Sequence, residues 1–354
     1  MTPPYAISVI VPTRQRREAV RRLLAALGRQ TLAADRFEVI VSVDGSNDGT
    51  SEMLDQLPTS YALRRVFQPH GGRAAACNAG VRAAQGETVV LLDDDMAPVP
   101  ECLSAHLCAH AAHPRTGVLG AVPVEIGESV PPVAAYIADR FGRHLAKISA
   151  PGYSFQVRDF YSGNFSIRRD LLVDVGLFDE AFTIYGNEDI DLWLRLARAG
   201  VGLRYSAAAI AYQCYSKTFA DLARDTIAKG RTSVLLATKH PQAFSGLRLA
   251  TLHSASPRWR VARGALVSLS LWCPAVPVGV MRVVTVAERR RPRHLRRIYD
   301  FALDYFYWLG AYQALHEGGL RQLLGSIQQT PRGRRASTAS FGPSKSARGR
   351  SGGG

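Results

Sequence analysis

The chain has 354 residues, of which 47% are hydrophobic, and a formal net charge of +15. This length suits one α/β catalytic unit with an appendage. Five cysteines without paired spacing argue against a disulfide framework or a zinc ribbon and favour a reducing compartment. The first residues show no basic region followed by a long apolar run, so we expect no secretory signal and a cytoplasmic location.

The first 92 residues alternate apolar strands with helices, which predicts an α/β fold whose mostly parallel sheet is flanked by helices. Ligands of such sheets bind beyond the carboxyl ends of the strands. That rule directs attention to 12–14, 44–49 and 93–95. The expected elements are a strand over 7–11, a helix with Val20, Leu23, Leu24 and Leu27 on one face, a strand over 37–43, a helix capped by Thr50, a strand over 63–67, a helix over 74–84 and a strand over 88–92.

The remainder of the chain is less regular. We expect a strand over 118–126, a loop punctuated by proline and glycine to about Ser154, and an aromatic amphipathic stretch over 301–315. Composition changes near residue 245, and the Gly/Ser/Arg-rich tail is predicted to be disordered. The predicted divisions are a nucleotide-sugar-binding half (1–115), an acceptor-binding half (116–245), a helical extension (246–330) and a basic tail (331–354).

Three consecutive carboxylates, Asp93, Asp94 and Asp95, follow the strand at 88–92. They repel one another unless a cation neutralises them, and Mg²⁺ or Mn²⁺ binds through one or two carboxylates plus substrate phosphates. In an extended segment Asp93 and Asp95 would point the same way and Asp94 the other. The alternative is a solvated acidic turn before a helix that starts near Val99.

Two further acidic segments are weaker signals when taken singly. The run 43–50 (VDGSNDGT) follows a strand, and a carboxylate there could accept a hydrogen bond from a nucleobase, yet these residue types also simply form turns. The run 185–192 (YGNEDIDL) enters a helix, where acidic residues are favoured anyway. One of its carboxylates could instead serve as a general base toward an acceptor hydroxyl.

In combination and in this order, these segments resemble the family 2 glycosyltransferases with a GT-A fold, over about residues 6–215. The matching blocks are ISVIVPTRQR, VDGSNDGT, GGRAAACNAGVRAAQGETVVLLDDD with its Asp-x-Asp motif, and YSGNFSIRRDLLVDVGLFDEAFTIYGNEDIDLWLRLARAGVGLRY, the last being a galactosyltransferase-like acceptor-side segment. The resemblance implies transfer of a sugar from a nucleotide-sugar, with UDP favoured, to an unknown acceptor, by metal-assisted displacement that inverts the anomeric carbon.

The resemblance also implies roles for individual residues. Asp189 would be the catalytic base, and Glu188 would position the acceptor. Asp95 and Asp93 would hold Mg²⁺ or Mn²⁺. The remaining donor-side residues would be Pro12, Thr13, Arg14, Asp44, Asn78 and Asp94, with Gly163 and Asn164 lining the donor-sugar pocket.

Three positions depart from the family pattern. Val43 replaces the first Asp of Val-Asp-Asp-Gly-Ser, while Asp44 matches the second. Cys77 stands where an arginine is usual, so Arg73 could supply the positive charge near the base or the phosphates. Gln213 occupies the place of a metal- or phosphate-facing histidine, and a neutral amide would bind metal more weakly.

Other features compete with this interpretation or add to it. His106, His110 and His113 share a predicted helix face, but a solvated face is expected there rather than zinc. Arg258-Trp259 lacks the glutamine of the processive synthase motif, which favours single addition. A nucleotidyltransferase would need a lysine in an N-terminal Gly-rich loop, which this chain lacks. An inactive GT-A-like binding module stays open as a further alternative.

The positive charge is concentrated near the C-terminus, with ten arginines over 258–297 and six basic residues after Pro331. The run 265–286 is apolar except for Arg282, and Pro274 and Pro277 interrupt it. We expect peripheral attachment to an anionic membrane face, with packing on the catalytic domain and a true membrane span as alternatives. Attachment would suit a lipid-linked acceptor. No nucleic-acid motif accompanies the charge, so nucleic acid is not expected as a partner.

Overall fold

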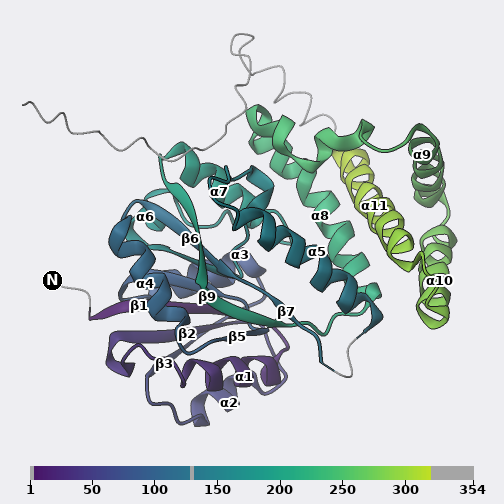
Figure 1. The fold of residues 1–354 in the computed structure, drawn as a ribbon. Coiled ribbons are helices and arrows are strands. Elements are labelled where there is room, and N and C mark those ends of the chain that lie inside the picture. Colours follow the sequence, from purple (N-terminus) through teal and green to yellow (C-terminus); the bar gives the residue numbers. More distant parts are fainter. Residues whose placement is uncertain (1–3, 128–130, 320–354) are drawn as a thin grey trace, which may run out of the picture.

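The computed structural model describes residues 4–127 and 131–319 (Figure 1). The strands are β1 (Tyr5–Thr13), β2 (Phe37–Asp44), β3 (Ala62–Gln68), β4 (Gly86–Leu92), β5 (Met96–Pro98), β6 (Thr116–Ala121), β7 (Val124–Glu125), β8 (Asn164–Arg168) and β9 (Gly202–Cys214). The helices are α1 (Arg17–Leu27), α2 (Thr50–Gln56), α3 (Arg73–Ala83), α4 (Cys102–Ala112), α5 (Pro132–Ile148), α6 (Arg169–Asp174), α7 (Glu188–Arg198), α8 (Phe219–Lys239), α9 (Pro257–Trp272), α10 (Ala275–Arg290) and α11 (Leu295–Ala314). Short 3-10 turns are Ala34–Arg36, Val157–Asp159, Pro241–Gly246 and Arg248–His253, and a π-turn follows α11 at Leu315–Gly319.

The predicted parallel sheet is confirmed in the N-terminal half. The order is β3-β2-β1-β4 with all three pairings parallel, and Ile10 of β1 lies opposite Ile40 of β2 and Leu91 of β4. Side chains of a strand alternate between its two faces. Ile10 therefore packs with Cys77 of α3 on one face, while its neighbours in β1 pack with α1 on the other. The strand is buried on both faces because helices cover both.

The sheet continues with mixed directions into the second half. β8 runs antiparallel to β4 and β6, β9 runs parallel to β6, and β5 and β7 pair with the end of β9. The single strand expected over 118–126 is two strands, β6 and β7, separated at Val122 and Pro123. The helix α2 is preceded by Gly49 in a left-handed conformation, so Thr50 begins the helix rather than capping it.

The loop expected to reach about Ser154 is wrong, because α5 occupies much of that segment. The helix begins at Pro132, and proline at a first helical position costs no hydrogen bond. Val133, Ala134 and Tyr136 are buried in the same apolar cluster as residues of α8 and α11. The proline pattern predicts a loop here, but Pro132 is the first residue of a helix.

A helical layer covers one side of the sheet domain, with α11 lying directly against α8 (Figure 1). Two glycines allow this close approach: a Cβ on Gly230 of α8 would overlap the carbonyl oxygen of Tyr307, and one on Gly310 of α11 would overlap that of Ile227. The expected stretch 301–315 is confirmed as helix, and it is buried on most of its faces. Because α5, α8 and α11 share one core, the packing runs across residue 245, and the predicted division there stays a prediction.

The apolar run 265–286 forms parts of two helices, α9 and α10, which are separated at Cys273 and Pro274. Among residues 4–127 and 131–319, no helix has the length and apolar character needed to cross a membrane. Both helices pack on α11. The tail predicted to be disordered, 331–354, lies outside the described residues.

Candidate active site

The acidic triplet lies at the end of β4 in a turn, which the Met96 amide closes by donating to the Asp93 carbonyl oxygen at 3.2 Å. This turn corrects the expectation that the segment is extended and that Asp94 points away from its neighbours. Asp94 and Asp95 instead share one guanidinium nitrogen of Arg16, at 2.5 and 3.3 Å. Thr13, at the end of β1, also donates to Asp94 at 2.8 Å.

The three carboxylates differ in their electrostatic surroundings. Burial raises the pKa of Asp94 to about 6, although the charge of Arg16 opposes the shift. Burial also raises the pKa of Asp95, and the neighbouring charge of Asp93 adds to the effect. Burial acts on Asp93 in the same sense, but the charge and hydrogen bond of Arg73, together with the charges of Lys217 and Arg16, outweigh it and lower the pKa of Asp93. Asp93 is therefore the most strongly ionised member of the group.

The geometry around Asp95 fits a divalent cation. The Oδ1 atom of Asp95 is buried and has no hydrogen-bond partner among the described residues, while Oδ2 lies 3.4 Å from Nε2 of Gln213. A Cβ on Gly163 would lie only 2.5 Å from Oδ2 of Asp93, so glycine leaves room at that oxygen. No group of three or more His, Cys, Asp or Glu residues able to hold a metal occurs in the described chain. Two carboxylates suffice, however, when substrate phosphates complete the coordination.

Arg73, at the start of α3, joins the acidic turn to the second acidic segment. Its guanidinium lies 2.7 Å from Asp93 and 3.4 Å from Glu188, and it donates to the hydroxyl of Ser162 at 3.1 Å. Glu188 also accepts from the amide of Gly186 at 2.9 Å. Arg73 therefore lies beside the predicted site carboxylates, while its predicted contact with the base or the phosphates stays a prediction. Its side chain fixes the distance between the two acidic segments.

Asp189 lies in the first turn of α7. Burial raises its pKa to about 6, and the adjacent charge of Glu188 contributes to the shift. The turn before α7 is anchored to α8, because Asn187, which has a positive φ of 68°, donates to the hydroxyl of Thr232 at 2.7 Å. A carboxylate that ionises near neutral pH at a fixed position is suited to accept a proton.

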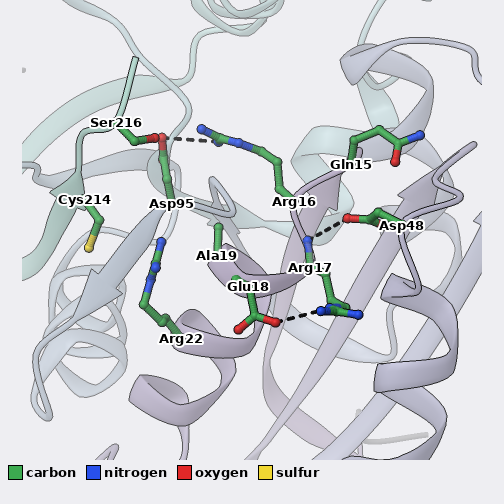
Figure 2. Close-up of a pocket in the computed structure, with 10 residues that line it drawn as sticks. All are labelled: Gln15, Arg16, Arg17, Glu18, Ala19, Arg22, Asp48, Asp95, Cys214 and Ser216. Carbon is green, nitrogen blue, oxygen red and sulfur yellow. Dashed lines mark hydrogen bonds and ion pairs between the residues drawn. The ribbon is translucent and has the colours of Figure 1, made fainter. Parts of the chain in front are cut away.

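A cavity of about 350 Å³ opens beside Asp95 (Figure 2). Arg16 reaches across it to Asp95, and the loop after β9 forms another of its walls through Ser216. This volume lies within the range of small-molecule sites. The lining residues are Gln15, Arg16, Arg17, Glu18, Ala19, Arg22, Asp48, Asp95, Cys214 and Ser216. Its arginines suit an anionic ligand such as a diphosphate.

Asp44 lies at the end of β2 and is buried. Its two oxygens accept from the amides of Gly71 and Gly72 at 2.7 and 3.0 Å and pair with Gln68 and His70 at 2.9 and 2.7 Å. Burial opposes ionisation, but these hydrogen bonds outweigh it and lower the pKa of Asp44. A nucleobase could bind Asp44 only by displacing one of these partners, so the predicted base contact stays a prediction.

Asn78 and Asn164, two predicted donor-binding residues, are held by hydrogen bonds within the protein. Asn78 is fully buried, donates to the carbonyl of Phe178 and the carboxylate of Glu180, and accepts from the Phe178 amide. Asn164 donates to the carbonyls of Ala121 and Ala209 and pairs with His106. Both amide groups use their two N–H donors within the protein, while each amide oxygen has one hydrogen-bond partner and can accept a second. The donor-binding role predicted for both residues stays a prediction.

The histidine face on α4 also differs from the expectation. His106 and His110 are buried rather than solvated, and both lie within 2.8 Å of the Ser166 hydroxyl. Burial lowers the pKa of each to about 4, so both are neutral at pH 7. They form a core network beneath β8 because that strand presents Asn164 and Ser166 toward α4.

Two basic residues of the site were missed by sequence reasoning. Arg16, rather than the exposed Arg14, contacts the acidic turn, and its place before α1 is the one signal that could have indicated it. Lys217 follows β9, donates to Asp225 at 2.6 Å and lies 5.0 Å from the ring centre of Tyr185. Its charge opposes the burial that raises the pKa of Asp95. No sequence spacing could show this, because the fold brings the end of β9 back to the acidic turn, where the Cys214 amide donates to the backbone carbonyl oxygen of Asp95 at 2.8 Å.

The acidic turn lies beyond the carboxyl ends of the parallel strands, where α/β sheets bind their ligands. The model of glycosyl transferase family 2 matches residues 8–176, and the model described as N-terminal domain of galactosyltransferase matches residues 142–217. The resemblance to glycosyl transferase family 2 is thus confirmed over residues 8–176. Its homologues likewise indicate a glycosyltransferase.

Two curated relatives illustrate the similarity. Validoxylamine A glucosyltransferase of Streptomyces hygroscopicus is 31% identical over 226 residues, covering 56% of this chain and 53% of that protein. The pre-mycofactocin glycosyltransferase of Mycobacterium tuberculosis is 28% identical over 237 residues, covering 66% and 48%. The chain thus spans about half the length of these relatives.

Solved structures confirm the GT-A fold. The mannosyltransferase PcManGT from Pyrobaculum calidifontis, in complex with GDP-Man and Mn²⁺, is 20% identical with a TM-score of 0.59, covering 89% of both chains. TarS 1-349 of S. aureus, in complex with UDP-GlcNAc, is 17% identical with a TM-score of 0.51, covering 90% of this chain and 92% of that one.

Proposed function

We propose that this chain transfers one sugar from a nucleoside diphosphate sugar to an acceptor hydroxyl, with inversion and with help from a divalent cation. One observation carries the proposal: Arg73 bridges Asp93 of the acidic turn and Glu188 beside Asp189. Donor-side and acceptor-side carboxylates are thereby held around one volume, as a displacement between two substrates requires.

The donor would lie along the carboxyl edge of β1, β2 and β4. Pro12, Thr13 and Asp44 are the proposed contacts of the nucleoside, and Arg16 faces the diphosphate from the cavity beside Asp95. A UDP-sugar is favoured, while GDP and dTDP sugars are alternatives that the experiment below separates. The structural neighbours solved with GDP-Man and with UDP-GlcNAc support the class of donor.

Asp95, Asp93 and Gln213 are the residues that would hold Mg²⁺ or Mn²⁺. The unpaired Oδ1 atom of Asp95 is the support for this proposal. When bound, the cation supplies positive charge to the departing diphosphate, whose developing negative charge is the main obstacle to reaction. Because Gln213 has a neutral amide, this site would bind the cation more weakly than a site with a histidine at that position.

Asp189 is the proposed general base. It accepts the proton of the acceptor hydroxyl as that oxygen bonds to the anomeric carbon from the face opposite the diphosphate. The bond from this carbon to the diphosphate oxygen breaks, and the leaving group takes the electron pair. Glu188, held by Arg73 and the Gly186 amide, would orient the acceptor. A base with a pKa of about 6 is ionised at neutral pH and retains some basicity.

The test is thermal stability with UDP, GDP and dTDP, each with and without Mn²⁺, on wild type and Asp95→Ala. A ligand at a hundredfold its Kd should stabilise the fold by about 2.7 kcal/mol. A metal-dependent shift with one nucleotide, lost in Asp95→Ala, supports the proposal. Asp170→Ala is the matched control, since it removes an exposed aspartate of α6 outside the site. The absence of any shift would contradict nucleotide binding altogether.

Assays of sugar transfer distinguish a glycosyltransferase from the two alternatives, an inactive binding module and a nucleotidyltransferase. Nucleotide binding with no sugar transfer to any acceptor or to water would favour a binding module, for which Gln213 is the supporting feature. Release of inorganic diphosphate would favour a nucleotidyltransferase. The cytoplasmic location expected from the cysteines stays a prediction, although all five are free thiols in the structure.

A further inference from the structure

The helices α9 and α10 expose apolar side chains at helical spacing. On α9, Val261, Leu269 and Trp272 lie on one face, eight and three residues apart, and are 75%, 54% and 88% exposed. On α10, Val278, Val283 and Val286 are five and three residues apart and are each at least 45% exposed. A soluble helix normally turns its apolar face inward. Here large apolar side chains on both helices face solvent.

The faces that these helices turn toward α11 are held by the buried side chains of Val267 and Val284 and by polar contacts. Arg263 of α9 pairs with Asp304 at 2.8 Å, and the hydroxyls of Ser270 and Tyr305 lie 2.6 Å apart. Tyr299 donates to Glu288 of α10 at 2.9 Å. The apolar side chains on the opposite faces are therefore not used to attach the helices to the protein. Figure 1 shows α9 and α10 at the outer edge of the helical layer, with α11 between them and α8.

Positive charge surrounds the apolar faces. Residues 257–297 contain ten arginines and a single carboxylate, that of Glu288. Arg282 lies among the exposed valines of α10, and Arg289 and Arg290 follow them at its end; all three are exposed. Long arginine side chains can lay their methylene groups along apolar surface and extend the charged group outward. The surface is thus apolar at its centre and cationic at its rim.

We propose that the exposed face of α9 and α10 binds the surface of a membrane that contains anionic lipids, with Trp272 and the valines among the acyl chains and the arginines at the headgroups. Basic amphipathic helices bind this chemistry through apolar burial and electrostatic attraction together. A protein partner or a second copy would have to supply carboxylates at the same rim. The surface of this chain that carries α9 and α10 does not offer them, which favours lipid over self-association.

The inference goes beyond the proposed function, because it concerns binding and not transfer. Taken with that function, it places the acceptor among lipid-linked substrates or glycans at a membrane surface. The active site itself takes no part in the lipid contact, so failure of one proposal leaves the other standing.

The test is flotation of the full-length protein with vesicles of phosphatidylcholine, alone or with phosphatidylglycerol. We expect binding to the anionic vesicles that weakens as salt is added. Trp272 also provides a direct signal, since it is 88% exposed, whereas Trp193 and Trp308 are buried and the partly buried Trp259 donates to Asp304 at 2.8 Å. Its fluorescence should shift to shorter wavelength on binding and be quenched by brominated acyl chains. The quenching should disappear in Trp272→Phe.

Matched variants assign the binding to this surface. Trp272→Ser with Leu269→Ser should reduce binding to anionic vesicles by at least about tenfold, since each buried CH₂ contributes about 0.8 kcal/mol. Arg289→Gln with Arg290→Gln should do the same, since each arginine near the surface contributes about 1 kcal/mol. Val173→Ser, on an exposed apolar residue of α6, is the control and should bind as wild type.

Three results would overturn the proposal. One is equal binding of wild type and the Trp272/Leu269 variant. Another is loss of binding on deletion of 320–354 alone, which would assign it to the basic tail. The last is a concentration-dependent dimer in solution that the Trp272/Leu269 variant abolishes, which would show that the face binds a second copy.

Discussion

Replacing Asp189 by asparagine should stabilise the protein while abolishing transfer. The pKa of Asp189 is about 6 against an ordinary value of 3.8, chiefly because of burial, so ionisation at pH 7 costs folding free energy. A shift of about two pH units corresponds to about 3 kcal/mol, which is the upper limit of the gain in Asp189→Asn. If Asp189 is the base, activity should fall by about a hundredfold or more.

The sign of the pH dependence follows from the direction of the shift. Because the folded-state pKa is raised, the destabilising charge is fully present above about pH 6 and absent below the ordinary value of 3.8. The stability advantage of Asp189→Asn should therefore be present at pH 7 to 8 and vanish near pH 4. Wild-type kcat/KM should rise with pH and level off above about pH 6.

Asp191 provides the matched control in the same helix. It is buried and lies 2.7 Å from His240 and 2.9 Å from Arg195, so it is a partner in a buried ion-pair network. Asp191→Asn should destabilise the fold by about 3 kcal/mol, the cost of breaking such a pair. Urea unfolding and initial transfer rates measure both quantities. The reasoning fails if Asp189→Asn is destabilised like Asp191→Asn, or if it retains a tenth of wild-type activity.

Three further outcomes are expected. Acidification from pH 6.5 to 4 should lower the free energy of unfolding by about 3 kcal/mol, because the pKa of buried His106 is lowered to about 4. His106→Gln should therefore make the urea midpoint depend less on pH. His294→Gln, at an exposed position, is the control and should leave this pH dependence unchanged. Gly310→Ala should destabilise by about 1–3 kcal/mol in the same assay, since its Cβ would overlap the carbonyl oxygen of Ile227 on the adjacent helix. Arg73→Lys should lower kcat by about tenfold or more with little change in nucleotide affinity measured by titration, because a lysine cannot span Asp93 and Glu188.

The sheet could be predicted from sequence because the apolar runs of β1, β2 and β4 are buried on both faces and are separated by helices with clear periodicity. Such signals are local. The helix α5 was missed because proline at its start has the opposite meaning from proline within a helix. The sequence alone does not show which of the two applies.

The positions of the candidate site's carboxylates could be predicted from the sequence, whereas the roles of its amide side chains could not. The acidic turn and the start of α7 follow directly from strand and helix ends, so Asp93, Asp95 and Asp189 lie near the expected places. Asn78 and Asn164 match the family pattern equally well, and their N–H groups donate to other segments of the protein. A buried amide can hold the fold or hold a substrate, and only the identity of its partners distinguishes the two.

The charge balance of the acidic turn refines the argument that three adjacent carboxylates require a metal ion. Arg16 pairs with Asp94 and Asp95, and Arg73 pairs with Asp93, so the protein's own cations neutralise most of the negative charge. The turn can therefore fold before any ion binds. The buried oxygen that the arginines leave without a partner is Oδ1 of Asp95, whose other oxygen lies beside Gln213. The need for a cation is thus confined to the atom where a diphosphate would meet the protein, which is why metal and nucleotide should bind together rather than separately.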